Sequence, residues 1–192
     1  MSVVVVDTGV ANLHSVTSAL SRLGAEWVVD TEIAGAERVI LPGVGSAEAG
    51  MKALESKGLV EPLRSFERPM LGICLGMQMM FEGLGESGGH GLGLLSGDVA
   101  ELEAGGLPLP HMGWNTLEMA SDDALLAGVE PGAHVYFVHS FAAKPGANML
   151  ATSEYGERFV AVARRGNRMG CQFHPERSGA VGAQILRNFL SL

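Results

Sequence analysis

A cysteine placed between two glycines is the feature of this sequence with the clearest chemical meaning. The segment Gly72-Ile73-Cys74-Leu75-Gly76 has the glycine–x–nucleophile–x–glycine spacing of a nucleophile elbow, with cysteine as the nucleophile. An elbow turns a strand abruptly into a helix, and the glycines remove Cβ atoms that would clash there. We expect the thiol to be exposed at the end of the strand, facing a helix N-terminus that favours the thiolate. A cysteine that only packs in a core is the alternative.

A candidate general base lies near the end of the chain, in Phe173-His174-Pro175-Glu176. In an extended segment, residues two apart point the same way, so His174 and Glu176 are expected to project together. A carboxylate beside an imidazole fixes its tautomer and stabilises the imidazolium. Contact between His174 and Cys74 requires that the two preceding strands end at the same edge of a sheet. The two segments together predict nucleophilic catalysis by cysteine.

The elements that must position these residues alternate between strands and helices in the first part of the chain. A buried strand ending in a tight turn is expected at 2–6, and Asn12 is placed to cap the helix that follows. Ser46 is placed to cap another helix. Alternating strands and helices predict a parallel sheet covered on both faces. The remaining expected elements are strands near 27–29, 38–41 and 70–73 and helices at 12–23, through 51–54, near 59–66 and at 75–81.

The second part of the chain has a different pattern. Residues 82–97 are rich in glycine and have no period, so we expect a long surface loop. Short strands separated by turn residues follow, which predicts added antiparallel pairing. A terminal helix at about 180–190 has one apolar stripe and should pack on the sheet. The expected strands are 98–102, 134–138, 149–153, 160–164 and 169–173.

Composition excludes several classes of function. The chain has 192 residues, 47% of them apolar, which is the size and content of one compact domain. Its net charge is −8 without a basic run, so nucleic acid is not an expected partner. The apolar runs are far shorter than the ~20 residues that cross a bilayer, so we expect a soluble, cytoplasmic protein. The second cysteine, Cys171, does not form a Cys-x-x-Cys pair with Cys74 and is expected to be buried.

These motifs resemble those of a known family. The glycine–x–cysteine–x–glycine–x–glutamine run at 72–78 and the His-Pro-Glu segment at 174–176 resemble the class I glutamine amidotransferases. Segments 7–15, 42–45, 110–115 and 136–140 are similar to one branch of that family, the amidotransferase subunits of imidazole glycerol phosphate synthases. The resemblance implies a single amidotransferase domain over 1–192. It also implies a three-layer, flavodoxin-like α/β fold with a mostly parallel central sheet, helices on both faces and antiparallel strands in the second half.

The resemblance also implies roles for particular residues. Catalysis falls to Cys74, His174 and Glu176, and no metal or organic cofactor is expected. This chain departs from the family pattern at Thr8, Ala11 and Phe141, where the family usually has tyrosine, glycine and an aromatic hydroxyl. The other implied residues are Gly43, Val44, Gly45 and Leu75 for the oxyanion, Gln78, Glu86, His139, Ser140 and Phe141 for glutamine, and Asn12, Met112, Trp114 and Asn115 for a partner interface.

The implied reaction is the hydrolysis of glutamine to glutamate and ammonia through a cysteine thioester. In that branch of the family the ammonia passes to a (β/α)8 cyclase subunit, which makes imidazole glycerol phosphate and aminoimidazole carboxamide ribotide in histidine biosynthesis. The resemblance therefore implies a heterodimer. Alternatives are a vitamin B6-type glutaminase, a partner-independent γ-glutamyl hydrolase or cysteine peptidase, and a regulatory subunit that has lost its chemistry.

Overall fold

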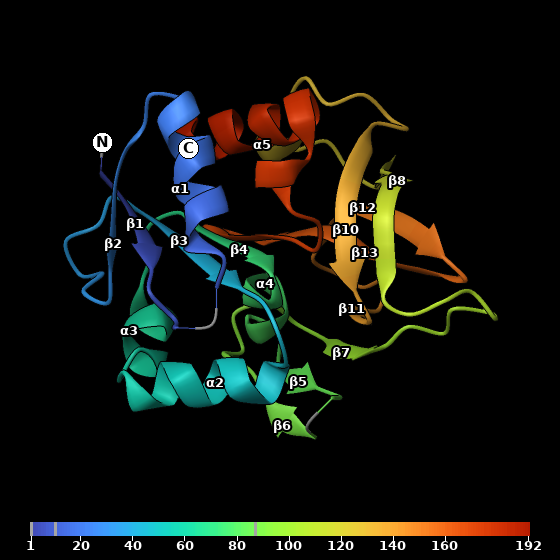
Figure 1. Ribbon diagram of the computed structural model, residues 1–192, viewed down its shortest axis with the longest axis horizontal. Coiled ribbons are helices and arrows are strands. Elements are labelled where there is room, and N and C mark those ends of the chain that lie inside the picture. The colour runs from blue at the N-terminus through green and yellow to red at the C-terminus, as the bar shows by residue number, and fades with distance from the viewer. Residues whose placement is uncertain (1, 10, 87) are drawn as a thin grey trace.

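A mixed sheet forms the centre of the protein, seen in a computed structural model that describes residues 2–9, 11–86 and 88–192 (Figure 1). Residue 10, in the family-like segment 7–15, and residue 87, in the expected loop 82–97, lie outside the described residues. In the described part the sheet has eight strands, of which the first five in the spatial order pair in parallel and the others antiparallel. That order is β2 (Glu26–Asp30), β1 (Ser2–Val6), β3 (Arg38–Gly43), β4 (Met70–Cys74), β14 (Arg168–Cys171), β13 (Glu157–Arg165), β12 (Met149–Tyr155) and β9 (Glu118–Met119).

Helices cover both faces of this sheet. Figure 1 shows α1 (Leu13–Arg22) and α5 (Gly179–Ser191) on one side, and α2 (Ala47–Ser56), α3 (Val60–Ser65) and α4 (Leu75–Met79) on the other. Alternate residues of β1 enter two separate cores, because successive side chains of a strand point to opposite faces. The mostly parallel, three-layer α/β architecture with added antiparallel strands is confirmed.

The helix starts follow from their capping residues. The side chain of Asn12 accepts a hydrogen bond from the Ser15 backbone N–H, and that of Ser46 accepts one from Ala49, so both expected caps are confirmed. The expected helix at 75–81 is shorter, since α4 ends at Met79. Within the described ranges, none of the helices has the length and apolarity that crossing a membrane requires.

Two smaller sheets flank the central one. In the first, β8 (His111–Thr116) pairs antiparallel with β10 (His134–His139). The second has the order β11 (Phe141–Ala143), β7 (Asp98–Glu101), β5 (Gly83–Leu84), β6 (Gly89–His90). The sequence did not predict β8, because its run His-Met-Gly-Trp-Asn-Thr mixes glycine, polar and large apolar residues without a clear alternation of hydrophobicity. Short 3-10 turns occur at Ala124–Leu126 and Pro175–Arg177.

The prediction of a surface loop at 82–97 was wrong in part. The short strands β5 and β6 fall inside this range, and β5 pairs in parallel with β7. Leucines along the segment are buried in the core beneath α2 and α4, which gives it a packing role that its glycine content concealed. The buried side chains are Leu84, Leu92, Leu94 and Leu95.

Candidate active site

The backbone at Cys74 has the geometry of a nucleophile elbow. Cys74 ends β4 and precedes α4, and with φ 53° it is the one non-glycine residue of positive φ in the described part of the chain. The flanking glycines are required by close approach of backbone. A Cβ atom at Gly76 would lie 1.8 Å from the carbonyl oxygen of Leu41, and one at Gly72 would lie 2.7 Å from the backbone of Met77. The predicted strand-to-helix turn is confirmed.

The thiol of Cys74 is more enclosed than the sequence suggested. The residue is only 7% exposed, and its Sγ atom lies 3.7 Å from the carbonyl oxygen of Val138 and 3.8 Å from Nε2 of Gln172. These neighbours come from β10 and from the residue just after β14, so the thiol opens into a pocket rather than to bulk solvent. Cys171 is fully buried, and burial raises the pKa of its thiol, as expected of a packing residue.

His174 and Glu176 form a buried pair. His174 Nδ1 and Glu176 Oε1 are 2.8 Å apart, and both side chains are almost completely covered. The sequence predicted that both residues lie in extended chain, but Glu176 does not. A 3-10 turn at Pro175–Arg177 follows His174 and folds the carboxylate back onto the ring. The predicted pairing is therefore correct, although the local geometry proposed for it was wrong.

The register of two parallel strands brings this pair to the nucleophile. Cys171 of β14 lies opposite Ile73 of β4, so Cys74 and His174 both follow at the same edge of the sheet. Burial acts to lower the pKa of His174, but attraction to Cys74 and Glu176 outweighs it and raises that pKa to about 10. The imidazolium is thus favoured at neutral pH. Its Nε2 atom is buried and has no hydrogen-bond partner among the described residues, which leaves it available for proton transfer.

A pocket of about 290 Å³ surrounds the thiol. Oxyanion candidates on two elements reach it, since the turn after β3 and the start of α4 both contribute to its wall. Gly43 lies opposite Cys74 in the pairing of β3 with β4. Two lining residues, Pro110 and Val138, had no role in the prediction, although both fall within family-like segments. The lining residues are Val44, Gly45, Cys74, Leu75, Gln78, Glu86, Pro110, Val138, His139, Ser140, Phe141 and His174.

The residues predicted to hold glutamine are bound to one another or to backbone. The Phe141 carbonyl oxygen lies 2.8 Å from Gln78 Nε2 and 2.9 Å from His139 Nδ1. A carboxylate oxygen of Glu86 accepts a hydrogen bond of 2.6 Å from the backbone N–H of Ala47, at the start of α2. The departure at Phe141 removes an aromatic hydroxyl, but the backbone carbonyl of this residue is the group that the neighbouring side chains use.

Three of the four predicted interface residues divide between the two faces of β8. Met112 and Trp114 are 62% and 57% exposed, so core packing of Trp114 is excluded. Asn115 points the other way by strand alternation, and its amide contacts His111 and the carbonyl of Glu154. Asn12 is at the start of α1, where its side chain caps the helix. An exposed apolar pair therefore marks the outer face of β8.

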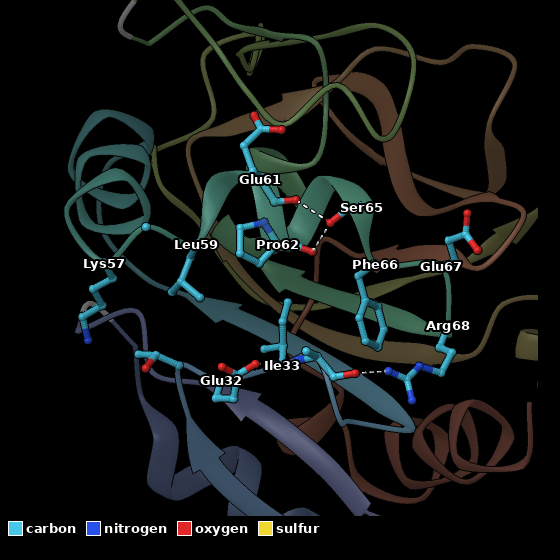
Figure 2. Close-up of a pocket in the computed structure, with 13 residues that line it drawn as sticks. Glu32, Ile33, Lys57, Leu59, Glu61, Pro62, Ser65, Phe66, Glu67 and Arg68 are labelled. Atoms are coloured by element: carbon cyan, nitrogen blue, oxygen red, sulfur yellow. Dashed lines mark hydrogen bonds between the residues drawn. The ribbon is translucent and has the colours of Figure 1, made fainter.

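A hollow larger than this pocket lies elsewhere on the protein (Figure 2). It measures about 860 Å³ and is lined from 31–34, 57–59, 61–62 and 65–68, which include none of the predicted site residues. Its cations are already engaged: Lys57 binds the carboxylate of Asp7, and Arg68 donates to the Ala34 carbonyl, as Figure 2 shows. The cysteine and histidine side chains predicted to act on substrate line the smaller pocket instead.

Comparison with known proteins identifies the family of this chain. Residues 4–192 match the family model "Glutamine amidotransferase class-I", and the chain belongs to that family. A curated relative from Shewanella loihica is 48% identical over 98% of this chain and 90% of its own length, and one from Xanthomonas axonopodis pv. citri is 50% identical over 99% and 97%. Each is named imidazole glycerol phosphate synthase subunit HisH.

Solved structures share the fold. A crystal structure of a glutamine amidotransferase matches with a TM-score of 0.74 at 21% identity, over 98% of this chain and 97% of that one. A glutamine amidotransferase from Thermotoga maritima matches with a TM-score of 0.66 at 20% identity, over all of this chain and 81% of that one. The class I amidotransferase architecture is therefore common to chains with little sequence in common.

Proposed function

We propose that this chain is the glutamine-hydrolysing subunit of an imidazole glycerol phosphate synthase and acts in histidine biosynthesis. The observation that carries the proposal is the pocket in which the Cys74 thiol meets the paired His174 and Glu176. Close similarity to relatives named as such subunits, over nearly the whole length of both chains, supports the choice of pathway. The 192 residues act as one amidotransferase domain in the cytoplasm.

The first half of the reaction forms a thioester. The thiolate of Cys74 attacks the carboxamide carbon of glutamine, and the carbonyl oxygen becomes an oxyanion. Backbone N–H groups of Val44 and Leu75 stabilise this charge, since Leu75 is the first residue of α4 and its N–H has no acceptor within the helix. His174 then gives its proton to the departing nitrogen, so ammonia leaves as the C–N bond breaks.

The second half releases glutamate. Neutral His174 takes a proton from water, the resulting hydroxide equivalent adds to the thioester carbonyl, and the C–S bond breaks to regenerate the thiolate and the imidazolium. Glu176 keeps the imidazole oriented and stabilises its charged form throughout, at the 2.8 Å separation observed. Gln78, Glu86 and the segment 139–141 hold the amino-acid end of the substrate.

The ammonia is transferred to a (β/α)8 cyclase in a heterodimer with this chain. Support for an interface comes from the exposed Met112 and Trp114 on the outer face of β8, because large apolar side chains with high exposure mark association surfaces. The ring of Trp114 packs against that of Tyr136 on β10, which holds it in a fixed place on this face. Asn12, at the start of α1, and Asn115, on the inner face of β8, are further interface candidates.

The test is the variant Cys74→Ala in the complex with the cyclase. Glutamine hydrolysis is expected to be abolished, while product formation from added ammonium salt continues, because the thiol serves only the first of these. Cys171→Ala is the matched control, since it removes a fully buried thiol that does not line the pocket. Retained glutamine-dependent turnover in Cys74→Ala, or failure of the parent chain to form a complex with the cyclase, would overturn the proposal.

A further inference from the structure

A backbone carbonyl fixes the direction of a buried hydrogen-bond chain beside the nucleophile. The carbonyl oxygen of Phe141 has two side-chain neighbours, the terminal amide of Gln78 at 2.8 Å and the Nδ1 atom of His139 at 2.9 Å. A carbonyl oxygen only accepts hydrogen bonds, and it has two lone pairs. Both neighbours must therefore donate, so Gln78 presents its NH₂ group here and His139 carries its proton on Nδ1.

The requirement on Gln78 propagates to Gln172. The same NH₂ group of Gln78 is 3.0 Å from the amide of Gln172, which must then present its oxygen. The NH₂ group of Gln172 is left facing the Sγ atom of Cys74, at 3.8 Å. Gln172 is fully buried, and it immediately follows β14 on the way to His174. The amide thus has a single orientation, in which a donor faces the sulfur.

The requirement on His139 propagates to β8. With its proton on Nδ1, neutral His139 accepts on Nε2 from Nδ1 of His111, 3.1 Å away. His111 then accepts on Nε2 from the NH₂ group of Asn115, at 3.3 Å. Burial lowers the pKa of His111 to about 4, and chiefly burial lowers that of His139 to about 3, so both rings have the neutral form that this pattern needs.

The far end of the chain agrees with the near end. Asn115 must present NH₂ to His111, and independently its Nδ2 atom donates to the carbonyl of Glu154 at 2.8 Å while its oxygen accepts from the Thr116 backbone N–H. Two backbone carbonyls, at Phe141 and Glu154, therefore impose the same polarity on the side chains between them. The agreement fixes the proton positions of His139 and His111 from both ends, while the orientations of Gln78 and Gln172 follow from the Phe141 carbonyl.

We infer that Gln172 is a catalytic residue whose amide donates a hydrogen bond to the Cys74 thiolate. Gln78 is the positioning residue that fixes its direction, and His139, held by His111 and Asn115, is a second donor that anchors the Phe141 carbonyl on which Gln78 depends. The inference rests on the proposed glutamine hydrolysis, for which Cys74 is the nucleophile. In the neutral thiol the S–H group can donate to the Val138 carbonyl, 3.7 Å away. The thiolate has no proton to give, and a donor at Gln172 favours it by a charge-assisted hydrogen bond.

The test measures the reactivity of Cys74 without using glutamine. In a Cys171→Ala background, the rate of alkylation by iodoacetamide is followed against pH in the full chain with its cyclase. Gln172→Met removes the donor at similar length, and Gln172→Glu keeps an acceptor for Gln78 but turns a carboxylate oxygen toward the sulfur. The titratable groups that already face this pocket are His174, His139 and Glu86, and they are unchanged in both variants.

We expect the pH midpoint of alkylation to rise by about one unit or more in Gln172→Met, the size of a lost charge-assisted hydrogen bond, and further in Gln172→Glu. For glutamine hydrolysis we expect a lower kcat with little change in KM. The control is Gln184→Glu, the same chemical change on α5, where the amide binds Asn188 far from the pocket. An unchanged midpoint in folded Gln172→Met overturns the inference. If the buried charge of Gln172→Glu prevents that variant from folding, the result for Gln172→Met decides by itself.

The positioning residues have a separate readout. His111 stacks between the rings of Phe137 and Tyr155, so His111→Phe keeps the stack but removes both hydrogen bonds of the ring. We expect a smaller shift of the alkylation midpoint in the same direction, which loss of packing alone would not produce. A folded His111→Phe chain with the parent midpoint would remove His111 and Asn115 from the positioning chain. If the alkylation midpoints shift as inferred but the parent chain does not hydrolyse glutamine in its complex, the proposed function is overturned and the inference about Gln172 is not.

Discussion

Replacing Glu176 by glutamine separates charge from geometry in the His174–Glu176 pair. The parent has a 2.8 Å contact between His174 Nδ1 and Glu176 Oε1. Oε2 of Glu176 is buried and makes no hydrogen bond among the described residues. In Glu176→Gln, no donor competes for the amide oxygen at that second position. The oxygen can therefore stay on Nδ1, and the ring keeps its proton on that atom.

The expected loss is moderate for this reason. A hydrogen bond to a charged group contributes about 1.5–3 kcal/mol and a neutral one about 0.5–1.5 kcal/mol, so the change removes about 1–2 kcal/mol. Since 1.36 kcal/mol is tenfold in rate, kcat should fall about 5- to 30-fold. In catalytic triads where an amide replaces the carboxylate and stabilises the wrong histidine tautomer, kcat falls about 10⁴-fold instead. His174→Ala removes the acid itself and should cost more than Glu176→Gln, within or above the usual ~10²–10⁴-fold range.

The change also has a defined effect on pH dependence. The pKa of His174 is raised from 6.5 to about 10 in the folded chain, so the protonated ring contributes stability in full below pH 6.5 and loses it as the pH rises toward 10. Removing the carboxylate removes one of the attractions that raise this pKa. The loss of stability between pH 6.5 and 10 should become shallower, and the alkaline limb of kcat should move to lower pH.

The assay is steady-state glutamate release by the complex with cyclase and its ligand, from pH 6 to pH 10, alongside thermal unfolding at each pH. Glu130→Gln, the same change at an exposed position, is the control. A loss in Glu176→Gln equal to that in His174→Ala, with both variants folded, would refute the orienting role. A parent-like alkaline limb would refute the electrostatic part of the reasoning.

Two further predictions follow from the backbone around the site. Gly76→Ala places a Cβ atom 1.8 Å from the Leu41 carbonyl oxygen and should lower the free energy of urea unfolding by about 3 kcal/mol or more. Gly35→Ala is the control, because a Cβ atom there has no atom within 4 Å and stability should stay near that of the parent. Equal stabilities of the two variants would contradict the need for glycine at the elbow. The isolated chain should hydrolyse glutamine about 10²–10³-fold more slowly than the liganded complex. Val44 is exposed between Gly43 and Gly45, the latter at φ +95°, so the Val44 N–H can turn away from the oxyanion. Full activity of the free chain would leave these glycines as turn residues only.

Short motifs predicted the centre of the site because their chemistry is local. The glycines around Cys74 are required by contacts within the turn, and Glu176 reaches His174 across two residues, so the spacing alone contains both constraints. The parallel sheet was predictable for a similar reason, since each strand in the first half is followed by a capped helix. What the spacing did not contain was the 3-10 turn after His174, where tertiary packing overrides the extended geometry.

Gln172 shows why the rest of the pocket could not be predicted. It is a glutamine that immediately follows a buried strand, with no motif of its own apart from its proximity to His174, and its partners are 94 and 98 residues away in the chain. The inner face of β8 was missed as well. His111 and Asn115 are polar, so the hydrophobic alternation that identifies a strand is absent, although the structure buries His111 almost completely.

The two faces of β8 connect the proposed interface with the nucleophile. Met112 and Trp114 point outward to solvent, while His111 and Asn115, offset by one residue, point inward to the hydrogen-bond chain that ends at Cys74. The two pairs belong to one strand, so a partner that shifted Met112 and Trp114 along the strand axis would shift His111 and Asn115 by the same distance. Asn115 opposes such movement through its bond to the Glu154 carbonyl on β12 of the central sheet. The same strand can therefore accept a partner while His111 keeps its bond to His139, the second donor on the Phe141 carbonyl.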